Sequence, residues 1–428
     1  MKNTLSYRII LPNEFKILNE TISYYRRCVN YLIDIVLIEY DESLSPMKDK
    51  NRIEKMIHST RANQAKYEIF DQLFYKMPCY LRRSALTEAY GIVQAYKSQM
   101  TNWEANNKEG KKPFLKRNQA FMPAFYKGNM FEMVSRNICR MKIYKNNDWV
   151  WHNFRMRNSD IKYIEKYFSM EEASAPVIEK ANKRYALRLT FQKETKMPEK
   201  VSRVCAVDMG LNHDAVCSII DEDGTVIARR FIDNAREKDH MNHILNNIKK
   251  AQSHGNRKTP RLWRFYNNYT KALCNQTVHD IVMFALEYQA QCIVCEYLDM
   301  KGKIHGNKKQ RLALWRHRDI QHKLECRAHR EGLRFAHVNA RNTSKLAYDG
   351  SGQVIRNKKN HSLCTFQTGK EYNCDLSASY NIGARYFIRE RLKTLSEKKR
   401  SDIQAKVPEC SVRTSCTLST LISLDAVL

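Results

Sequence analysis

The feature that most constrains the fold of this chain is a short apolar run that ends in an acid. It spans Val204–Leu211 with the sequence V-C-A-V-D-M-G-L, so Asp208 is its acid and Gly210 marks a turn. A second apolar run follows, then the turn residues Asp221–Gly224 and a third run over Thr225–Phe231. Apolar runs separated by such turn residues predict a strand followed by a hairpin. We therefore expect an antiparallel sheet that carries Asp208 at its rim, a position suited to metal binding.

Two further acids occupy equivalent places later in the chain. Glu296 closes a run rich in branched residues, and Asp375 opens a stretch with helical spacing. The order strand–strand–strand–helix–strand–helix–strand–helix is that of an RNase H-like α/β domain. After the hairpin and a charged region from Arg236 to about Arg264, the remaining predicted elements are a helix over 266–290, a strand over 291–297, a helix over 315–330, a strand over 333–338 and a helix from 375.

Asp208, Glu296 and Asp375 could thus meet at one rim of one sheet. Phosphodiester cleavage by two metals requires acids that hold two Mg²⁺ ions about 3.5–4 Å apart, and hard Mg²⁺ prefers oxygen ligands. Each acid also has a simpler interpretation. Asp208 could shape the turn before Gly210, Glu296 could be a solvated residue at a strand end, and Asp375 could be an N-cap.

The N-terminal part of the sequence changes twice between strand-like and helical spacing. Residues 4–11 alternate as an edge strand, and helical spacing dominates residues 13–42 and 51–107 up to a Gly/Lys/Pro-rich loop at 106–113. Short strand-like runs follow. We interpret this order as a small β-barrel with a helical lobe inserted after its first strand, followed by a linker at 192–200. The strand-like runs are 121–126, 130–134, 138–144, 149–154 and 184–191.

The charge balance favours a polyanionic partner. The chain has 74 Lys and Arg against 45 Asp and Glu, a formal net charge of +29. Each phosphate that a cation neutralises releases counterions, so nucleic acid is the first candidate. A solvated basic face and an acidic membrane surface are the alternatives. In the helical lobe, cations interleaved with aromatic residues suit phosphate contact and base stacking, although long cationic chains also cover apolar surface. These residues are Arg26, Arg27, Lys55, Arg61, Lys66, Lys76, Arg82, Arg83 and Lys97, with Tyr24, Tyr25, Tyr75, Tyr80, Tyr90 and Trp103.

Cysteine usage and hydropathy bear on the compartment. The 13 cysteines are an odd number scattered through apolar segments, which favours buried free thiols in a reducing compartment. We find no apolar run near the roughly 18 residues of a spanning helix and no secretory signal at the N-terminus. The expected setting is cytoplasmic, with no membrane partner.

At the three acids the chain resembles a known family. Val207–Leu211, Val294–Leu298 and Asp375–Ile382 are similar, in this order, to the three RuvC motifs of transposon-encoded TnpB proteins and of miniature type V CRISPR effectors. The resemblance covers residues 1 to about 390. It implies an RNA-guided DNA endonuclease with guide RNA and double-stranded DNA as partners, in which base pairing reads most of the sequence. It also implies that Asp208, Glu296 and Asp375 are the Mg²⁺ ligands.

The resemblance implies a division into five parts. These are a wedge-like β-barrel at 1–11 and 121–195, a helical recognition lobe at 12–120, a RuvC-like nuclease domain at 201–340 and 375–392, a degenerate zinc-ribbon-type insert at 341–374, and a C-terminal tail at 393–428. The tail begins charged and then becomes V-R-T-S-C-T-L-S-T-L-I-S-L. We expect it to be a flexible extension or a late packing strand.

The insert departs from the family pattern. The family usually has a four-cysteine zinc ribbon after a Thr-Ser-Lys, here Thr343–Lys345. In this chain, Ala347 and Gly350 stand where the first cysteine pair belongs, and Thr368 precedes Gly369 near the second. Tetrahedral zinc needs four N/S ligands, and Cys364 and Cys374 with His361 fall short, so we expect no structural zinc. Cys292 and Cys295 lie within one strand, where their spacing points them to opposite faces as core residues.

A second departure is Ser377, where the family has Asn. The change keeps the Asp375 ligand but could alter the groups that orient it and so reduce activity. The sequence thus leaves three functions open. The first is an RNA-guided endonuclease, and the second is an RNA-guided DNA-binding protein that cuts weakly or not at all. The third is an unguided resolvase or transposase of the same fold. Whether the chain is a monomer or a homodimer is also open.

Overall fold

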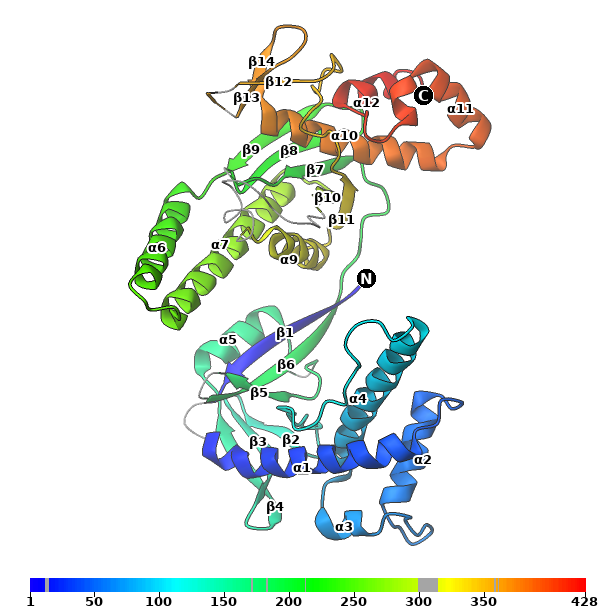
Figure 1. Ribbon diagram of the computed structural model, residues 1–428, viewed down its shortest axis with the longest axis vertical. Coiled ribbons are helices and arrows are strands. Elements are labelled where there is room, and N and C mark those ends of the chain that lie inside the picture. Colours follow the sequence, from blue (N-terminus) through cyan, green and yellow to red (C-terminus); the bar gives the residue numbers. More distant parts are fainter. Residues whose placement is uncertain are drawn as a thin grey trace. The chain divides into compact units, whose positions relative to one another are not determined.

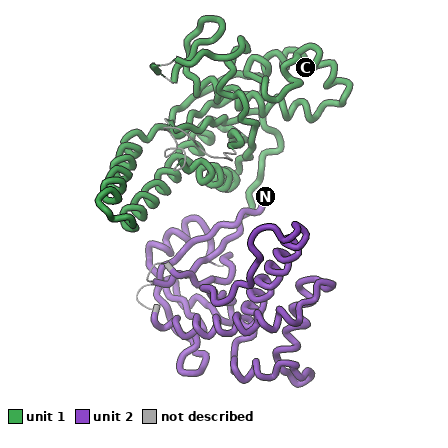
Figure 2. The backbone as a smooth tube through the Cα atoms, in the orientation of Figure 1, with its two compact units in different colours: residues 1, 194–428 green, residues 2–193 purple. Residues whose placement is uncertain are grey.

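The structure, a computed structural model, describes residues 1–11, 15–170, 172–181, 184–211, 213–298, 315–357, 359–360 and 362–428. The chain divides into two compact units, residues 2–193 and residues 194–428 together with Met1 (Figure 2). The division falls in the segment that the sequence predicted as a linker. No described helix is long and apolar enough to cross a membrane.

The first unit contains two three-stranded sheets. One has the order β1-β6-β5, and the other has the order β2-β3-β4. The sheets thus divide the strands of the predicted barrel into two sets, and its closure into a barrel stays a prediction. One predicted strand, 121–126, is wrong. It contributes only an isolated bridge from Ala124 to Val177, next to Pro123, which has no N–H to extend a ladder. The strands are β1 (Lys2–Ile10), β2 (Phe131–Ser135), β3 (Ile138–Lys145), β4 (Asp148–Arg155), β5 (Val177–Ala181) and β6 (Arg184–Glu194).

Helices lie between β1 and β2, as the sequence predicted for an inserted lobe (Figure 1). The longest are α1 (Phe15–Glu39) and α4 (Cys79–Ala105), which pack on each other. α2 (Pro46–Ile57) and α3 (Ile69–Leu73) connect them, and α5 (Asn158–Tyr167) follows β4. Apolar side chains at helical spacing on α1, such as Leu32 and Val36, are fully buried in one core with the strands.

The interleaved cations and aromatics of this lobe are only partly available to a ligand. Tyr24, Tyr25 and Tyr90 belong to the core. The Tyr24 ring packs on Tyr144 of β3 and Trp149 of β4. Arg82 is buried and contacts Glu54 at 3.3 Å. Tyr75, by contrast, is 68% exposed. The three buried rings are therefore core residues, and base stacking in this lobe stays a prediction for its exposed members.

The second unit is built on a five-stranded sheet with the order β11-β10-β7-β8-β9. β7 pairs antiparallel with β8, and β8 with β9, while β10 runs parallel to both β7 and β11. This is the predicted strand followed by a hairpin, and Gly224 in the hairpin turn has φ 94°. The strands are β7 (Arg203–Asp208), β8 (Ala215–Asp221), β9 (Val226–Ile232), β10 (Cys292–Tyr297) and β11 (Arg334–Asn339).

Helices cover both faces of this sheet (Figure 1). α7 (Pro260–Glu287) and α9 (His317–Arg330) pack on one face, and α10 (Cys374–Thr394) packs on the other. The charged region after the hairpin begins with a further helix, α6 (Ala235–Ser253), which was not predicted. Only Ile244 and Ile248 of α6 are buried, so its sequence has a weak apolar face.

The C-terminal tail is neither flexible nor a strand, so that prediction is wrong. It forms α11 (Glu397–Lys406), the 3₁₀ turn η1 (Pro408–Ser411) and α12 (Leu418–Asp425). Leu421 and Leu424 are fully buried in the core that contains α10. A capping box between Thr417 and Thr420 begins α12, which explains how a Ser/Thr-rich segment becomes helical here.

Candidate active site

Asp208 is the last residue of β7, the central strand of the sheet. The side chains of β7 point alternately to the two faces of the sheet. Val204 and Ala206 point to the face that α10 covers, and Cys205 and Val207 point to the face of α7 and α9. Two residues beyond Ala206, Asp208 belongs to the face of α10. At the other end of the strand, Arg203 donates to Asp221 at 2.6 Å. Asp208 is partly buried.

Glu296 lies beside Asp208 on the neighbouring strand. The parallel register pairs Cys292 with Val204 and Cys295 with Val207, and Glu296 and Asp208 are the next residues of the two strands beyond this last pair. Adjacent strands lie about 4.8 Å apart. Glu296 is 8% exposed, and it therefore is not the solvated strand-end residue of the simpler interpretation. Cys292 and Cys295 are buried on opposite faces, which confirms their prediction as core residues.

Asp375 reaches the same rim from the first turn of α10. It is not the N-cap, because Asn373 holds that position and accepts hydrogen bonds from the backbone N–H of Asp375 and Leu376. α10 then lies close against the sheet at Gly383, where an added Cβ would come 3.2 Å from the Cβ of Ala206. This close approach sets the start of α10 against the strands that carry Asp208 and Glu296.

The three carboxyl groups interact electrostatically. Burial raises the pKa of Asp208 well above its ordinary value, and the negative charges of Glu296 and Asp375 raise it further. Burial also raises the pKa of Glu296, while the Thr343 hydroxyl and the Arg385 guanidinium act in the opposite direction. Burial likewise raises the pKa of Asp375, against the effect of His213 and Arg356. Acids that repel one another in this way favour either a shared proton or a bound cation.

The donor set fits Mg²⁺. Carboxylate oxygens are its preferred protein ligands, and a cation would relieve the repulsion that raises the pKa of Asp208. Among the described residues, no three His, Cys, Asp or Glu side chains close around a single point as a metal cage. Mg²⁺ usually keeps several waters and takes further oxygens from substrate phosphates, so an open set of acids suits it better than a closed cage.

Glu296 is held by two neighbours that the sequence analysis did not assign. The Thr343 hydroxyl donates to its carboxylate, and Gln321 Nε2 donates to its backbone carbonyl at 2.7 Å. Asn381 Nδ2 in turn donates to the carbonyls of Thr343 at 3.0 Å and Leu346 at 2.9 Å. Thr343 lies in the Thr-Ser-Lys segment and Asn381 in the segment Asp375–Ile382. Their place in these motifs was the sequence signal that could have identified them.

Arg385 is a buried cation that ties the tail to this site. It is 5% exposed, and its guanidinium donates to four backbone carbonyls. Asn339 ends β11 and Arg341 follows it, and the other two, Thr414 and Cys416, lie in the tail. Burial lowers the pKa of Arg385, and the charge of Glu296 opposes this effect. Arg385 therefore holds the segment before Thr343 and the segment before α12 against α10.

The insert between the second and third acids keeps a small core of its own. It contains the short strands β12 (Ile355–Arg356), β13 (Leu363–Thr365) and β14 (Glu371–Asn373). Ala347, Cys364, Phe366 and Cys374 form one buried cluster, with Tyr348 and Tyr372 against it. Burial and the neighbouring Cys374 thiol raise the pKa of Cys364 to about 12. His361 lies outside the described residues, and the absence of zinc stays a prediction.

Ser377 contacts the insert. Its hydroxyl accepts a hydrogen bond from the backbone N–H of Tyr348 at 3.2 Å. The described hydrogen bonds of Ser377 thus join α10 to the Tyr348 segment, and the expected influence of Ser377 on Asp375 stays a prediction.

Comparisons with known proteins identify solved structures with a similar fold. A family described as Aq_aa04 matches residues 3–145. No curated protein matches the chain. Among solved structures, the chain is similar to the mini-RNA-guided endonuclease CRISPR-Cas_phi3, with a TM-score of 0.53, 11% identity, and coverage of 90% of this chain and 92% of that one.

Two further structures match with lower TM-scores. The Cas12f1-sgRNA-target DNA complex has a TM-score of 0.36 and 16% identity, over 89% of this chain and 98% of that one. The Alicyclobacillus acidoterrestris C2c1 complex with single-guide RNA has a TM-score of 0.45 and 10% identity, over 85% of this chain and 65% of that one. The resemblance inferred from the three motifs is therefore confirmed at the level of fold, and this chain shares its fold with a miniature RNA-guided endonuclease.

Proposed function

We propose that this chain is an RNA-guided DNA endonuclease that hydrolyses DNA phosphodiester bonds at a single Mg²⁺-dependent, RuvC-like site. The observation that carries the proposal is the meeting of Asp208, Glu296 and Asp375 at one rim, with electrostatic coupling between Asp208 and the other two. The sheet order β11-β10-β7-β8-β9, three antiparallel strands followed by two parallel ones, supports an RNase H-like assignment. The shared fold with an RNA-guided endonuclease supports the same reaction class.

In this proposal each residue has a defined task. Two Mg²⁺ ions, when bound, would activate water and stabilise the leaving oxygen. Asp208, Glu296 and Asp375 would be their ligands. Thr343 orients the Glu296 carboxylate, and Arg385 supplies a positive charge that favours its ionised form. The formal net charge of +29 favours binding of both RNA and DNA.

The division of labour along the chain is part of the proposal. Residues 12–120 would form the recognition lobe, and residues 1–11 and 121–195 the wedge-like domain. The nuclease domain would comprise residues 201–340 and 375–392, interrupted by the insert at 341–374. All 13 cysteines are free thiols, which suits the reducing cytoplasm that we propose as its location.

The decisive experiment begins with the RNA that co-purifies with the chain. Its sequence identifies the guide, and a DNA duplex complementary to it can then be tested across a magnesium titration. We expect guide-dependent cleavage that Asp208→Ala, Glu296→Ala and Asp375→Ala each abolish without loss of DNA binding. Glu222→Ala is the matched control, because Glu222 follows β8 and pairs with Lys200 at 2.9 Å.

Other outcomes would decide against the proposal. Cleavage that survives Asp208→Ala would refute the role of that residue. Guide-dependent binding without cleavage at any magnesium concentration would establish the non-cutting DNA-binding protein instead. Absence of co-purifying RNA would favour an unguided nuclease.

A further inference from the structure

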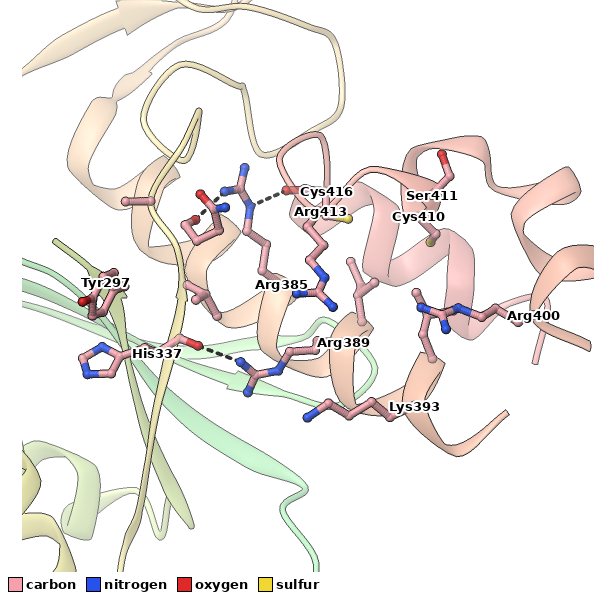
Figure 3. Close-up of a pocket in the computed structure, with 15 residues that line it drawn as sticks. Tyr297, His337, Arg385, Arg389, Lys393, Arg400, Cys410, Ser411, Arg413 and Cys416 are labelled. Atoms are coloured by element: carbon pink, nitrogen blue, oxygen red, sulfur yellow. Dashed lines mark hydrogen bonds between the residues drawn. The ribbon is translucent and has the colours of Figure 1, made fainter. Parts of the chain in front are cut away.

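The second unit contains a pocket beside the candidate active site. Its volume is about 400 Å³, and it lies between the ends of β10 and β11, the later turns of α10, and the segment from α11 to Cys416 (Figure 3). Tyr297, which lines it, directly follows Glu296. Arg385, which also lines it, acts electrostatically on Glu296 and so links the pocket to that acid.

The lining of this pocket is strongly basic. Five cationic side chains line it, and none of the described residues that line it is an acid. The cations are Arg385, Arg389, Lys393, Arg400 and Arg413. Such a concentration of one sign of charge in a concave site raises the local concentration of anions.

Three of these cations have partners within the protein. Arg385 donates to four carbonyls, and Arg389 donates to the His337 carbonyl at 2.7 Å and to Glu390 at 2.8 Å. Lys393 Nζ donates to Glu390 at 3.1 Å. These contacts hold the wall of the pocket together.

Arg400 and Arg413 differ from the other three. Both are exposed, and their guanidinium groups have no hydrogen bond or ion pair within the described part of the chain. Both point into the pocket from opposite segments, Arg400 from α11 and Arg413 from the loop before α12 (Figure 3). Two guanidinium groups aimed at one space are suited to bidentate recognition of phosphate oxygens.

The rest of the lining suits a nucleotide. Ile388, Leu392 and Cys410 give it an apolar floor. Tyr297 is 61% exposed at its edge and presents a ring on which a base can stack. Cations for phosphate together with an aromatic platform are the usual elements of single-strand binding.

We propose that this pocket binds a phosphodiester of the single nucleic-acid strand that passes the acid site, with Arg400 and Arg413 as the phosphate ligands. The inference deepens the proposed function and rests on it for the identity of the strand, which is either the RNA or one strand of the DNA. The binding itself does not depend on cleavage.

The test compares the loss of two cations that line the pocket with the loss of two cations that do not. The full chain freed of RNA is titrated with labelled dT12 and rU12 at several NaCl concentrations, and Arg400→Gln/Arg413→Gln is compared with Lys398→Gln/Lys399→Gln. The control pair removes the same charge from exposed positions of α11 that do not line the pocket. Arg400→Lys/Arg413→Lys tests whether charge alone is sufficient.

We expect the pocket pair to weaken binding and to reduce the slope of log Kd against log salt by about 0.7, the value for one lost phosphate contact on a single strand. The control pair should leave the slope unchanged. A larger effect on dT12 would assign the pocket to DNA, and a larger effect on rU12 would assign it to RNA. Equal losses for the two pairs, or no loss for either, would overturn the inference.

The same variants separate this inference from the proposed function. Glu222→Ala should leave oligonucleotide binding intact, because that residue pairs with Lys200 and does not line the pocket. If the chain proves unable to cleave DNA but the pocket pair still lowers the salt slope, the pocket stands and the endonuclease assignment fails. Thermal unfolding of each variant checks that the fold is unchanged.

Discussion

The carboxylate of Glu296 depends on side chains that lie far from it in the sequence. Thr343 donates to it, and Asn381, which is fully buried, holds the Thr343 backbone at 3.0 Å. Asn381 Oδ1 also accepts from the backbone N–H of Leu418 at 3.2 Å, at the start of α12. One buried amide thus joins the Thr343 loop, α10 and the C-terminal helix. Groups that orient a metal ligand typically change metal affinity or activity when they are lost.

Thr343→Val tests this arrangement because it removes the hydroxyl and keeps the size of the side chain. We expect DNA cleavage to fall by about 10–100-fold and the magnesium requirement to rise, since the Glu296 carboxylate loses its donor. Single-turnover cleavage across a magnesium titration measures both effects. Thr343→Ser keeps the hydroxyl and should retain activity, and equal activities for the Val and Ser variants would show that the hydrogen bond is irrelevant.

In the metal-free protein, Asp208 is expected to lower the free energy of unfolding at neutral pH. Its folded-state pKa is raised by burial and by the charges of Glu296 and Asp375. The folded state therefore binds the proton more tightly than the unfolded chain. The contribution of Asp208 to stability is therefore greatest below its unfolded-state pKa of about 3.9, and it is lost as the pH rises toward the folded-state pKa.

Asp208→Asn should therefore raise the Tm of the metal-free protein at pH 7.5. A gain of about 1 kcal/mol corresponds to about 2–4 °C in a unit of this size. The gain should shrink as the pH falls toward 4, and added Mg²⁺ should stabilise the original chain more than the variant. Glu222→Gln serves as the control, since Glu222 lies in the hairpin turn and pairs with Lys200. A Tm that falls on Asp208→Asn at pH 7.5 would contradict the predicted repulsion.

Among the elements, those with strong local patterns were predicted correctly. The strands β7 to β11 and the helices α7, α9 and α10 follow from apolar spacing and turn residues. α6 was missed because only two of its residues are buried. The C-terminal helices were missed because the β-branched, Ser/Thr-rich tail lacks a helical pattern, and its packing on α10 and its capping box override that local preference.

The candidate site was predictable to a similar extent. The strand-end positions of Asp208 and Glu296 and the helix-start position of Asp375 follow from local sequence, and the resemblance to known motifs added their expected role as Mg²⁺ ligands. Thr343, Asn381 and Arg385 were not predicted, because their hydrogen bonds join residues 29 to 47 positions apart and no periodicity in the sequence encodes such contacts.

The packing of α10 on the sheet is set by Gly383. An added Cβ would come 2.6 Å from the Ile220 Cδ1 and 3.2 Å from the Ala206 Cβ. Gly383→Val should therefore destabilise the second unit by about 1–3 kcal/mol, the usual cost of overpacking. It should also weaken cleavage, because α10 carries Asp375. Urea unfolding measures the loss, and Ile220→Ala in the same chain should recover part of it. An additive effect of the two substitutions would argue against contact between these positions.

At the scale of the whole molecule, the excess of positive charge opposes the compact state. A formal net charge of +29 repels itself, and pairs such as Arg203–Asp221 offset only part of this repulsion. Exposed ion pairs contribute about 0–1 kcal/mol each, so their number is a poor measure of stability. The bound polyanion in the proposed function would neutralise the excess and stabilise both units.

The chain freed of RNA should therefore gain stability as salt is added. Between 0.1 M and 1 M NaCl the Debye length falls from about 10 Å to about 3 Å, which screens the long-range repulsion between cations more than the contacts within ion pairs. We expect Tm to rise over this range, and an oligonucleotide at low salt to raise it without added NaCl. Sucrose at matched osmolality controls for effects on the solvent. Salt that instead lowers Tm would mean that paired charges outweigh the net repulsion, and the charge excess would then be evidence of binding alone.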